Sequence, residues 1–200
     1  MYYHPVSDLA AFVLAGGKST RMGRDKAFVE FDGKALLLRS LELVRTVAPN
    51  AGIVGDREKF SSFGPVIEDV YPERGPLGGI HAALANSKAE FNLMLAVDLP
   101  FVEPRFLEYL IAQACACGAT VTVPRVDGGW QPLCAVYRRE FAAVAEQALM
   151  AGNNKIDLIF PKVEIRVIDE TELSKLGVSG SMFRNLNTPE ELENARRINR

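Results

Sequence analysis

The chain has 200 residues, of which 48% are hydrophobic and 24% charged, an ordinary composition for a folded globular protein. We expect a single domain spanning residues 1–200, because this length leaves no room for a second sizeable domain. The 23 basic and 25 acidic side chains give a net charge of −2. This balance argues against a nucleic-acid-binding protein and against a polybasic protein of membrane surfaces.

The sequence carries no clear targeting segment and no cysteine or histidine motif. No apolar stretch reaches the roughly 18–20 residues that a membrane helix needs, and residues 1–5 lack a signal-peptide pattern. The three cysteines lack the paired spacing of a zinc or redox motif, so we expect reduced thiols and a cytoplasmic protein. With only two histidines, a histidine-based triad or a multi-histidine metal site is not expected.

Apolar runs alternate with helical patterns along the chain, without repeats or low-complexity linkers. We expect strands near residues 9–15, 53–54, 66–67, 91–97, 120–123, 133–137 and 163–168. Helices are expected near residues 36–47, 77–87 and 104–117, with another ending near residue 152 and a last one beginning after Thr188. Thr188 is followed by proline and, three residues on, by Glu191, which is the pattern of a helix N-terminus.

This alternation predicts a mostly parallel sheet covered by helices on both faces. The runs LAAFVLA (residues 9–15) and FNLMLAV (91–97) are the most apolar, so we expect them to be central, parallel neighbours. Ligands of such sheets bind beyond the carboxyl ends of the strands. We therefore expect Gly17 and Asp98, which follow these two strands, to open on one cleft.

The segment LAGGKSTRMGRDK (residues 14–26) follows the first strand. Its three glycines allow backbone N–H groups to approach an anion closely, and it carries four cations: Lys18, Arg21, Arg24 and Lys26. It is not a Walker A loop, since Phe12 stands where that motif has glycine, and it lacks GxGxxG. The alternatives are a phosphate-binding loop and a plain turn with solvated charges.

The pattern LAGG-x-x-x-RMG-x-DK resembles the signature loop of nucleotidyltransferases that activate sugars, polyols and cofactors, above all that of the molybdenum cofactor guanylyltransferases. Four further segments follow in the order of that family: GPLGGI (75–80), DLPF (98–101), QPL (131–133) and NLNTPE (185–190). The resemblance covers nearly the whole chain. It implies a three-layer αβα fold with a mixed, mostly parallel, Rossmann-like sheet of the nucleotide-diphospho-sugar transferase type.

The resemblance also implies an activity: transfer of GMP from GTP to the terminal phosphate of molybdopterin or molybdenum cofactor, with release of pyrophosphate. Mg²⁺ is the implied cofactor, with Asp98 as its ligand and Arg21 and Lys26 on the triphosphate. The other implied nucleotide-binding residues are Leu14, Ala15, Gly16, Gly17, Asp69, Gly75 and Gly79. Gln131, Asn185 and Asn187 are candidates for the second substrate or the metal. Proteins that deliver or accept the cofactor are possible transient partners, whereas nucleic acid and membranes are not expected.

Each of these positions also has a structural interpretation. Asp98 suits a turn before Pro100, and the Gly75–Gly79 segment suits a packed turn. Asn185 and Asn187, which share one side of an extended segment, suit helix capping. Trp130 lies in a loop where its ring would pack either on a pterin or on the protein.

Three other functions remain open. They are cytidylyl transfer to the same cofactor, nucleotidyl transfer to a sugar phosphate, and nucleotide binding without catalysis. After the second strand the family often has an asparagine that helps to read the base, but this chain has Gly55-Asp56, which leaves GTP and CTP less well separated. Together, Arg21, Lys26 and Asp98 favour an enzyme, because binding alone does not need a metal carboxylate.

Overall fold

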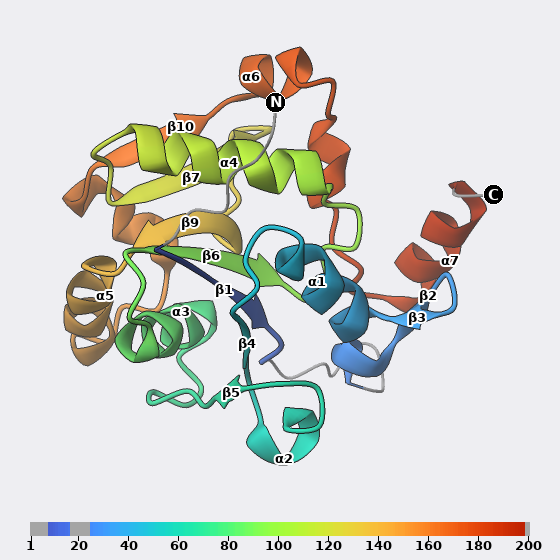
Figure 1. Ribbon diagram of the computed structural model, residues 1–200, viewed down its shortest axis with the longest axis horizontal. Helices are drawn as coiled ribbons and strands as arrows, with labels where there is room; N and C mark the ends of the chain where they lie inside the picture. The colour runs from blue at the N-terminus through green and yellow to red at the C-terminus, as the bar shows by residue number, and fades with distance from the viewer. Residues whose placement is uncertain (1–7, 17–24, 199–200) are drawn as a thin grey trace.

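The structure is a computed structural model that describes residues 8–16 and 25–198. An eight-stranded sheet forms its centre (Figure 1). Its strand order is β10 (Ile165–Ile168), β7 (Val121–Val126), β9 (Cys134–Arg138), β6 (Phe91–Ala96), β1 (Leu9–Leu14), β4 (Ala51–Val54) and β5 (Val66–Ile67), with β8 (Gly129–Trp130) paired to β7.

The two most apolar strands are central neighbours, as the sequence predicts. β1 and β6 pair in parallel from Leu9 opposite Phe91 to Leu14 opposite Ala96. β4 is parallel to β1 on its other side, and β5 is parallel to β4. The carboxyl ends of these four strands therefore lie at one edge of the sheet.

The other half of the sheet is mixed. β9 runs antiparallel to both β6 and β7, which makes β7 parallel to the central strands, and β10 is parallel to β7. β7 extends to Val126, beyond the expected 120–123, because it continues through a turn at Asp127 and Gly128 (φ 50° and 73°) into the hairpin strand β8. β10 begins at Ile165, two residues later than expected.

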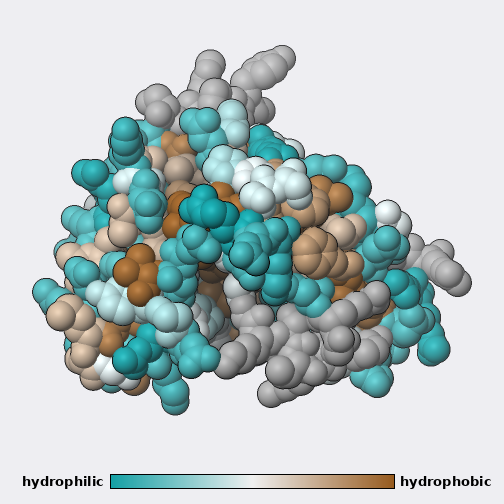
Figure 2. Space-filling view, turned by 90° about the horizontal axis from the view of Figure 1, so that it is seen from below, coloured by the Kyte–Doolittle hydropathy of each residue, from teal (hydrophilic) through white to brown (hydrophobic). Residues whose placement is uncertain are grey.

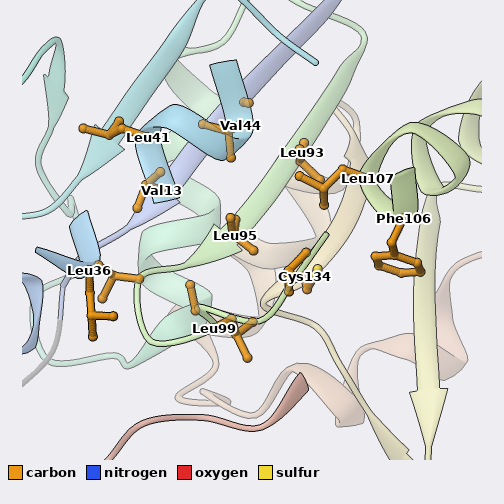
Figure 3. Close-up of a cluster of buried hydrophobic side chains, with 14 of the residues drawn as sticks. Val13, Leu36, Leu41, Val44, Leu93, Leu95, Leu99, Phe106, Leu107 and Cys134 are labelled. Carbon is orange, nitrogen blue, oxygen red and sulfur yellow. The ribbon is translucent and has the colours of Figure 1, made fainter. Parts of the chain in front are cut away.

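Helices cover both faces of the sheet, which confirms the three-layer prediction. α3 (Pro76–Asn86) and α5 (Phe141–Met150) pack on Phe12 and Met94. α1 (Leu36–Arg45) and α4 (Pro104–Ala116) pack on the neighbouring strand residues Val13 and Leu93. This alternation follows from the two-residue period of a strand. Figure 3 shows the core on the α1 and α4 side of the sheet, where side chains of β1 and β6 meet those of these two helices.

Short elements complete the chain. They are the 3₁₀ turns η2 (Lys26–Phe28), η3 (Ile156–Leu158), η4 (Phe160–Lys162) and η5 (Gly180–Phe183), the hairpin β2 (Glu30–Phe31) and β3 (Lys34–Ala35), and the helices α2 (Arg57–Phe60), α6 (Glu170–Lys175) and α7 (Pro189–Ile198). α7 lies beside the β2–β3 hairpin (Figure 1), where Arg196 Nη2 donates to the carbonyl oxygen of Glu30 at 2.9 Å. In the described part of the chain, no helix has the length and apolar character needed to cross a membrane.

Candidate active site at the carboxyl end of the sheet

The end of β1 is fixed between its two neighbouring strands. Ala15 N donates to Val54 O at 2.9 Å, and Val97 N donates to Leu14 O at 3.1 Å. Gly16 is the last described residue before the cationic part of the loop, so Gly17 and Arg21 lie outside the described residues. In Figure 1, β1 and β4 run toward the face that Figure 2 views from below. That face is hollowed, with apolar atoms in its depth and hydrophilic groups around it (Figure 2).

Three of the side chains singled out in the sequence meet at this edge. Lys26 Nζ lies 3.0 Å from Asp98 Oδ2 and also donates to Asn187 Oδ1. The three residues come from η2, from the turn after β6 and from the segment before α7. The Lys26 and Asp98 side chains are only 20% and 15% exposed, so water screens this ion pair less than it would a surface pair.

The last helix positions Asn187. Its backbone N–H and that of Thr188 donate to Glu191 Oε2 at 2.6 and 3.1 Å, and Glu191 N donates to Thr188 Oγ1 at 3.2 Å. This is the reciprocal capping box predicted from Thr188 and Glu191. Leu186, which is fully buried, donates its N–H to Asp98 O at 3.0 Å. The Asn187 segment is therefore attached both to α7 and to the turn that carries Asp98.

Asp25 fixes the turn that carries Lys26. Asp25 Oδ1 accepts from Ala27 N at 3.1 Å, which caps η2, and Asp25 Oδ2 pairs with Lys59 at 3.1 Å. This pairing raises the pKa of Lys59, mainly through its hydrogen bond to Asp25. The Lys26 backbone is thus held at the cleft, and its long side chain reaches Asp98 and Asn187.

Asp69 lies against the start of α3. A Cβ atom on Gly78 would come within 2.5 Å of Asp69 Oδ2, so this carboxylate needs a glycine at position 78. Asp69 Oδ1 accepts from Tyr71 N at 2.8 Å. Burial raises the pKa of Asp69 above its usual value, although this hydrogen bond and His81 act against the shift.

The glycines before and in α3 bring its first turn close to the central strands. Gly75 has φ +66°, a conformation that L side chains rarely adopt, and it precedes Pro76 at the helix start. A Cβ on Gly79 would lie 3.4 Å from Val54 and 3.9 Å from Leu14. Gly79 and Leu14, both predicted to bind nucleotide, are therefore neighbours at the carboxyl end of the sheet.

A second group of side chains behind Asp69 was missed by the sequence analysis. Tyr71 stacks edge-on against His81 with ring centroids 5.2 Å apart, and its hydroxyl donates to Glu146 Oε1 at 3.1 Å. His81 Nε2 lies 4.0 Å from the same carboxylate. These contacts join α3 to α5 next to Asp69. Tyr71 and Glu146 belong to no recognised motif, so only the structure places them here.

Position 55, directly after β4, has no room for a side chain unless Phe60 moves. A Cβ on Gly55 would come within 2.8 Å of the Phe60 ring and 3.5 Å of Gly16 N. The neighbouring Asp56 caps α2 by accepting from Glu58 N at 2.9 Å. Neither residue offers a free side chain beside Gly16.

The remaining candidates make fewer contacts. Asn185 is exposed, and Gln131 is partly buried, with its backbone N–H bonded to Pro124 O at 2.9 Å. Trp130 packs on the protein: its ring centroid is 5.2 Å from that of Phe160, and Arg125 lies over it at 5.0 Å. The described contacts of Trp130 thus agree with its structural interpretation.

The donor set at Asp98 fits a magnesium ion that is also bound by phosphate. Within residues 8–16 and 25–198, no group of three His, Cys, Asp or Glu side chains could hold a metal. The carboxylate of Asp98 and the amide oxygen of Asn187 converge on one point, however. Mg²⁺ is commonly bound by one or two carboxylates together with waters and substrate phosphates. The site therefore suits a metal that enters with a nucleotide.

A three-layer αβα fold with a cation, a carboxylate and an amide beyond its central parallel strands places the chain in the class of α/β proteins that bind ligands at the carboxyl ends of their strands. Comparison with known families is more specific. Residues 11–162 match the MobA-like NTP transferase domain, and the chain therefore belongs to this nucleotidyltransferase family.

Full-length relatives agree. The chain is 35% identical over 186 residues to a protein of Pelotomaculum thermopropionicum described as a probable molybdenum cofactor guanylyltransferase, covering 92% of this chain and 90% of that one. It is 33% identical over 190 residues to the molybdenum cofactor guanylyltransferase of Desulfosudis oleivorans, covering 94% of each. The crystal structure of molybdopterin-guanine dinucleotide biosynthesis protein A from Archaeoglobus fulgidus is similar with a TM-score of 0.82 at 30% identity, covering 94% and 97% of the two chains.

Proposed function

We propose that this protein is a molybdenum cofactor guanylyltransferase that transfers GMP from GTP to molybdopterin or its metal-loaded form. An oxygen of the terminal phosphate of molybdopterin forms a bond to the α-phosphorus of GTP. The bond from that phosphorus to the oxygen bridging to the β-phosphate breaks, and this oxygen leaves with pyrophosphate. The product is the guanine dinucleotide form of the cofactor.

The observation that carries this proposal is the contact of Lys26, Asp98 and Asn187 beyond the two central strands of a chain from this family. Asp98 would hold Mg²⁺ with help from Asn187. When bound, the ion would neutralise charge on the phosphates as the leaving group departs. Lys26 and Arg21, with backbone N–H groups of Gly16 and Gly17, would hold the triphosphate.

The nucleoside would bind where β1, β4 and α3 meet. Leu14, Ala15, Gly75 and Gly79 would form the surface for the base and ribose, and Asp69 would accept hydrogen bonds from nucleoside N–H or O–H groups. The close approach of Gly79 to Val54 and Leu14 supports this position. Since Gly55 offers no side chain, Asp69 and backbone groups would have to distinguish the bases.

This reaction needs no histidine base, because a phosphate nucleophile is already an anion at neutral pH. His81, the only histidine among the described residues, is 95% buried within α3 and belongs to the group behind Asp69. Catalysis would then depend on positioning and charge neutralisation, as in other phosphoryl transfers. Gln131 and Asn185 would contact the acceptor.

The direct test is pyrophosphate release with GTP, CTP, ATP or UTP, each with and without molybdopterin and Mg²⁺. We expect release only when GTP, molybdopterin and Mg²⁺ are all present. Release with CTP instead would assign cytidylyl transfer, and release with a sugar phosphate in place of molybdopterin would assign the other alternative. GTP binding with no release under any condition would identify a non-catalytic binding protein.

A further inference from the structure

Asp98 and Asn187 direct their oxygen atoms at a cation that belongs to the protein itself. The Lys26 ammonium lies 3.0 Å from Asp98 Oδ2 and in hydrogen-bond contact with Asn187 Oδ1. These are the two oxygens that fit a divalent ion, so the ammonium and the ion require the same acceptors. From this we infer that in the free protein Lys26 acts as a placeholder for the metal and keeps a divalent cation out until a nucleotide draws the lysine away.

Electrostatics prevents both cations from sharing these acceptors. Mg²⁺ binds oxygen at about 2.0–2.1 Å, so an ion on Asp98 Oδ2 would lie within a few ångströms of the ammonium. Repulsion between these charges is strong where water screens little. The Lys26 and Asp98 side chains are only 20% and 15% exposed. Metal binding therefore requires that Lys26 leave.

The backbones of the two acceptors are held in place, and Lys26 has the longer and more flexible side chain, so in this proposal the lysine is the residue that moves. Asn187 is held through its backbone by Glu191, and the adjacent Leu186 N–H is bonded to Asp98 O at 3.0 Å. Lys26 has an anchored backbone, with its Asp25 neighbour capping η2, but a flexible four-carbon stem. A triphosphate has several anionic oxygens that this ammonium can bind in place of Asp98.

This exchange gives the order in which nucleotide and metal bind at the site of the proposed function. It rests on that proposed function for the identity of the nucleotide. Triphosphate takes Lys26, and the freed oxygens of Asp98 and Asn187 then accept the metal. The free protein thereby avoids a bound metal without nucleotide, and nucleotide and metal bind cooperatively. Such coupling needs only that each ligand favour the same arrangement of Lys26.

The test uses Mn²⁺ as the probe, with free Mn²⁺ measured by electron paramagnetic resonance in the absence of nucleotide. The variants are Lys26→Met, which removes the ammonium, and Lys26→Gln, which keeps a hydrogen-bond donor in case Lys26→Met does not fold. Lys59→Met is the matched control: it removes one positive charge from a half-exposed lysine that pairs with Asp25 rather than Asp98. Thermal melting in EDTA checks each fold.

We expect wild type and Lys59→Met to bind Mn²⁺ weakly and equally, and the folded Lys26 variant to bind it at least about tenfold tighter because a repulsive charge is gone. Adding Asp98→Asn to the Lys26 variant should abolish the gain. Equal Mn²⁺ binding by wild type and the Lys26 variants would overturn the inference, as would the same gain in Lys59→Met. The measurement needs no turnover, so it stands apart from the outcome of the guanylyl-transfer assay.

Discussion

Two clusters, each built from a cation and a carboxylate, differ in how many hydrogen bonds their carboxylates accept. In the first, Asp98 accepts from Lys26, and its side chain has no other hydrogen bond among the described residues. In the second, on β10, α4 and α6, Glu172 accepts from both Nη atoms of Arg166, at 2.9 and 2.5 Å, and from the Tyr109 hydroxyl at 2.6 Å. The two ion pairs are similarly exposed. The side chains of Lys26 and Asp98 are 20% and 15% exposed, and those of Arg166 and Glu172 are 30% and 20% exposed.

This difference in hydrogen bonding suits the first cluster to the proposed ligand binding and the second to a structural role. Glu172 has its pKa lowered to about 2, chiefly by its hydrogen bond to Arg166, and it joins three elements that lie together at the top of Figure 1. Arg166 also donates to Gln113 Oε1 at 2.8 Å, so its guanidinium binds two different side chains. The Lys26 cluster keeps unused acceptor capacity on Asp98. A fully bonded cluster stabilises a fold, whereas a partly bonded one can exchange partners with a ligand.

Removing the cation of the first cluster should have a large effect on turnover. We expect Lys26→Ala to lower kcat/KM for GTP about 100-fold, as loss of one charged donor to the reacting phosphates does elsewhere. KM should rise as well, because the ammonium would meet the phosphates in both ground and transition states. Steady-state pyrophosphate release measures both constants. Near-wild-type kinetics in folded Lys26→Ala would remove this lysine from the triphosphate site.

Removing the carboxylate of the second cluster should affect stability and leave turnover unchanged. Glu172→Gln weakens charge-assisted hydrogen bonds from Arg166 and Tyr109, and we expect the free energy of unfolding in urea to fall by about 1.5–3 kcal/mol. Glu103→Gln is the control, since its pair with Arg105 is half-exposed and should contribute less than about 1 kcal/mol. Equal losses in both variants would show that the Glu172 cluster has no special structural role.

Acid should weaken the second cluster within a defined window. The pKa of Glu172 is about 2 in the folded protein against 4.5 for an ordinary glutamate. The group therefore stabilises the fold fully above pH 4.5, and this contribution is lost as the pH falls from 4.5 toward 2. In urea unfolding between pH 6 and pH 3, we expect wild type to lose more stability than Glu172→Gln. Parallel curves for the two proteins would contradict the low pKa.

The two asparagines near the first cluster should separate in kinetics. Asn187 contacts Lys26 and shares its acceptor role with Asp98, so Asn187→Ala should lower kcat about tenfold through weaker metal placement. Asn185 is exposed, and Asn185→Ala should instead raise KM for molybdopterin. A larger loss of kcat in Asn185→Ala than in Asn187→Ala would reverse these assignments.

Much of the fold could be predicted because local patterns carry it. The runs at 9–15 and 91–97 indicate buried central strands, and Thr188 with Glu191 indicates the start of α7. The antiparallel direction of β9 could not be predicted, because an apolar strand pattern is the same for either direction of pairing. The extension of β7 to Val126 was missed for a similar reason: an exposed Arg125 and a glycine turn resemble a loop.

The sequence singled out the residues of the candidate site, but it could not predict their contacts with one another. Lys26, Asp98 and Asn187 each stand in a recognisable segment, yet Lys26 is separated from its two partners by 72 and 161 residues. Only the packed sheet and the capping of α7 bring them together. The contact of Lys26 with the side-chain oxygens of Asp98 and Asn187, and the group of Tyr71, His81 and Glu146 behind Asp69, depend on tertiary packing that no local pattern records.

The central claim is that the partly bonded cluster at Asp98 performs the chemistry. It is tested most directly by pyrophosphate release from GTP, molybdopterin and Mg²⁺ with Asp98→Asn, which keeps the shape of the side chain and removes its charge. We expect turnover to fall by at least about 100-fold, GTP binding to change only modestly and the melting temperature to stay near that of wild type. A folded Asp98→Asn protein that releases pyrophosphate at the wild-type rate would contradict the claim.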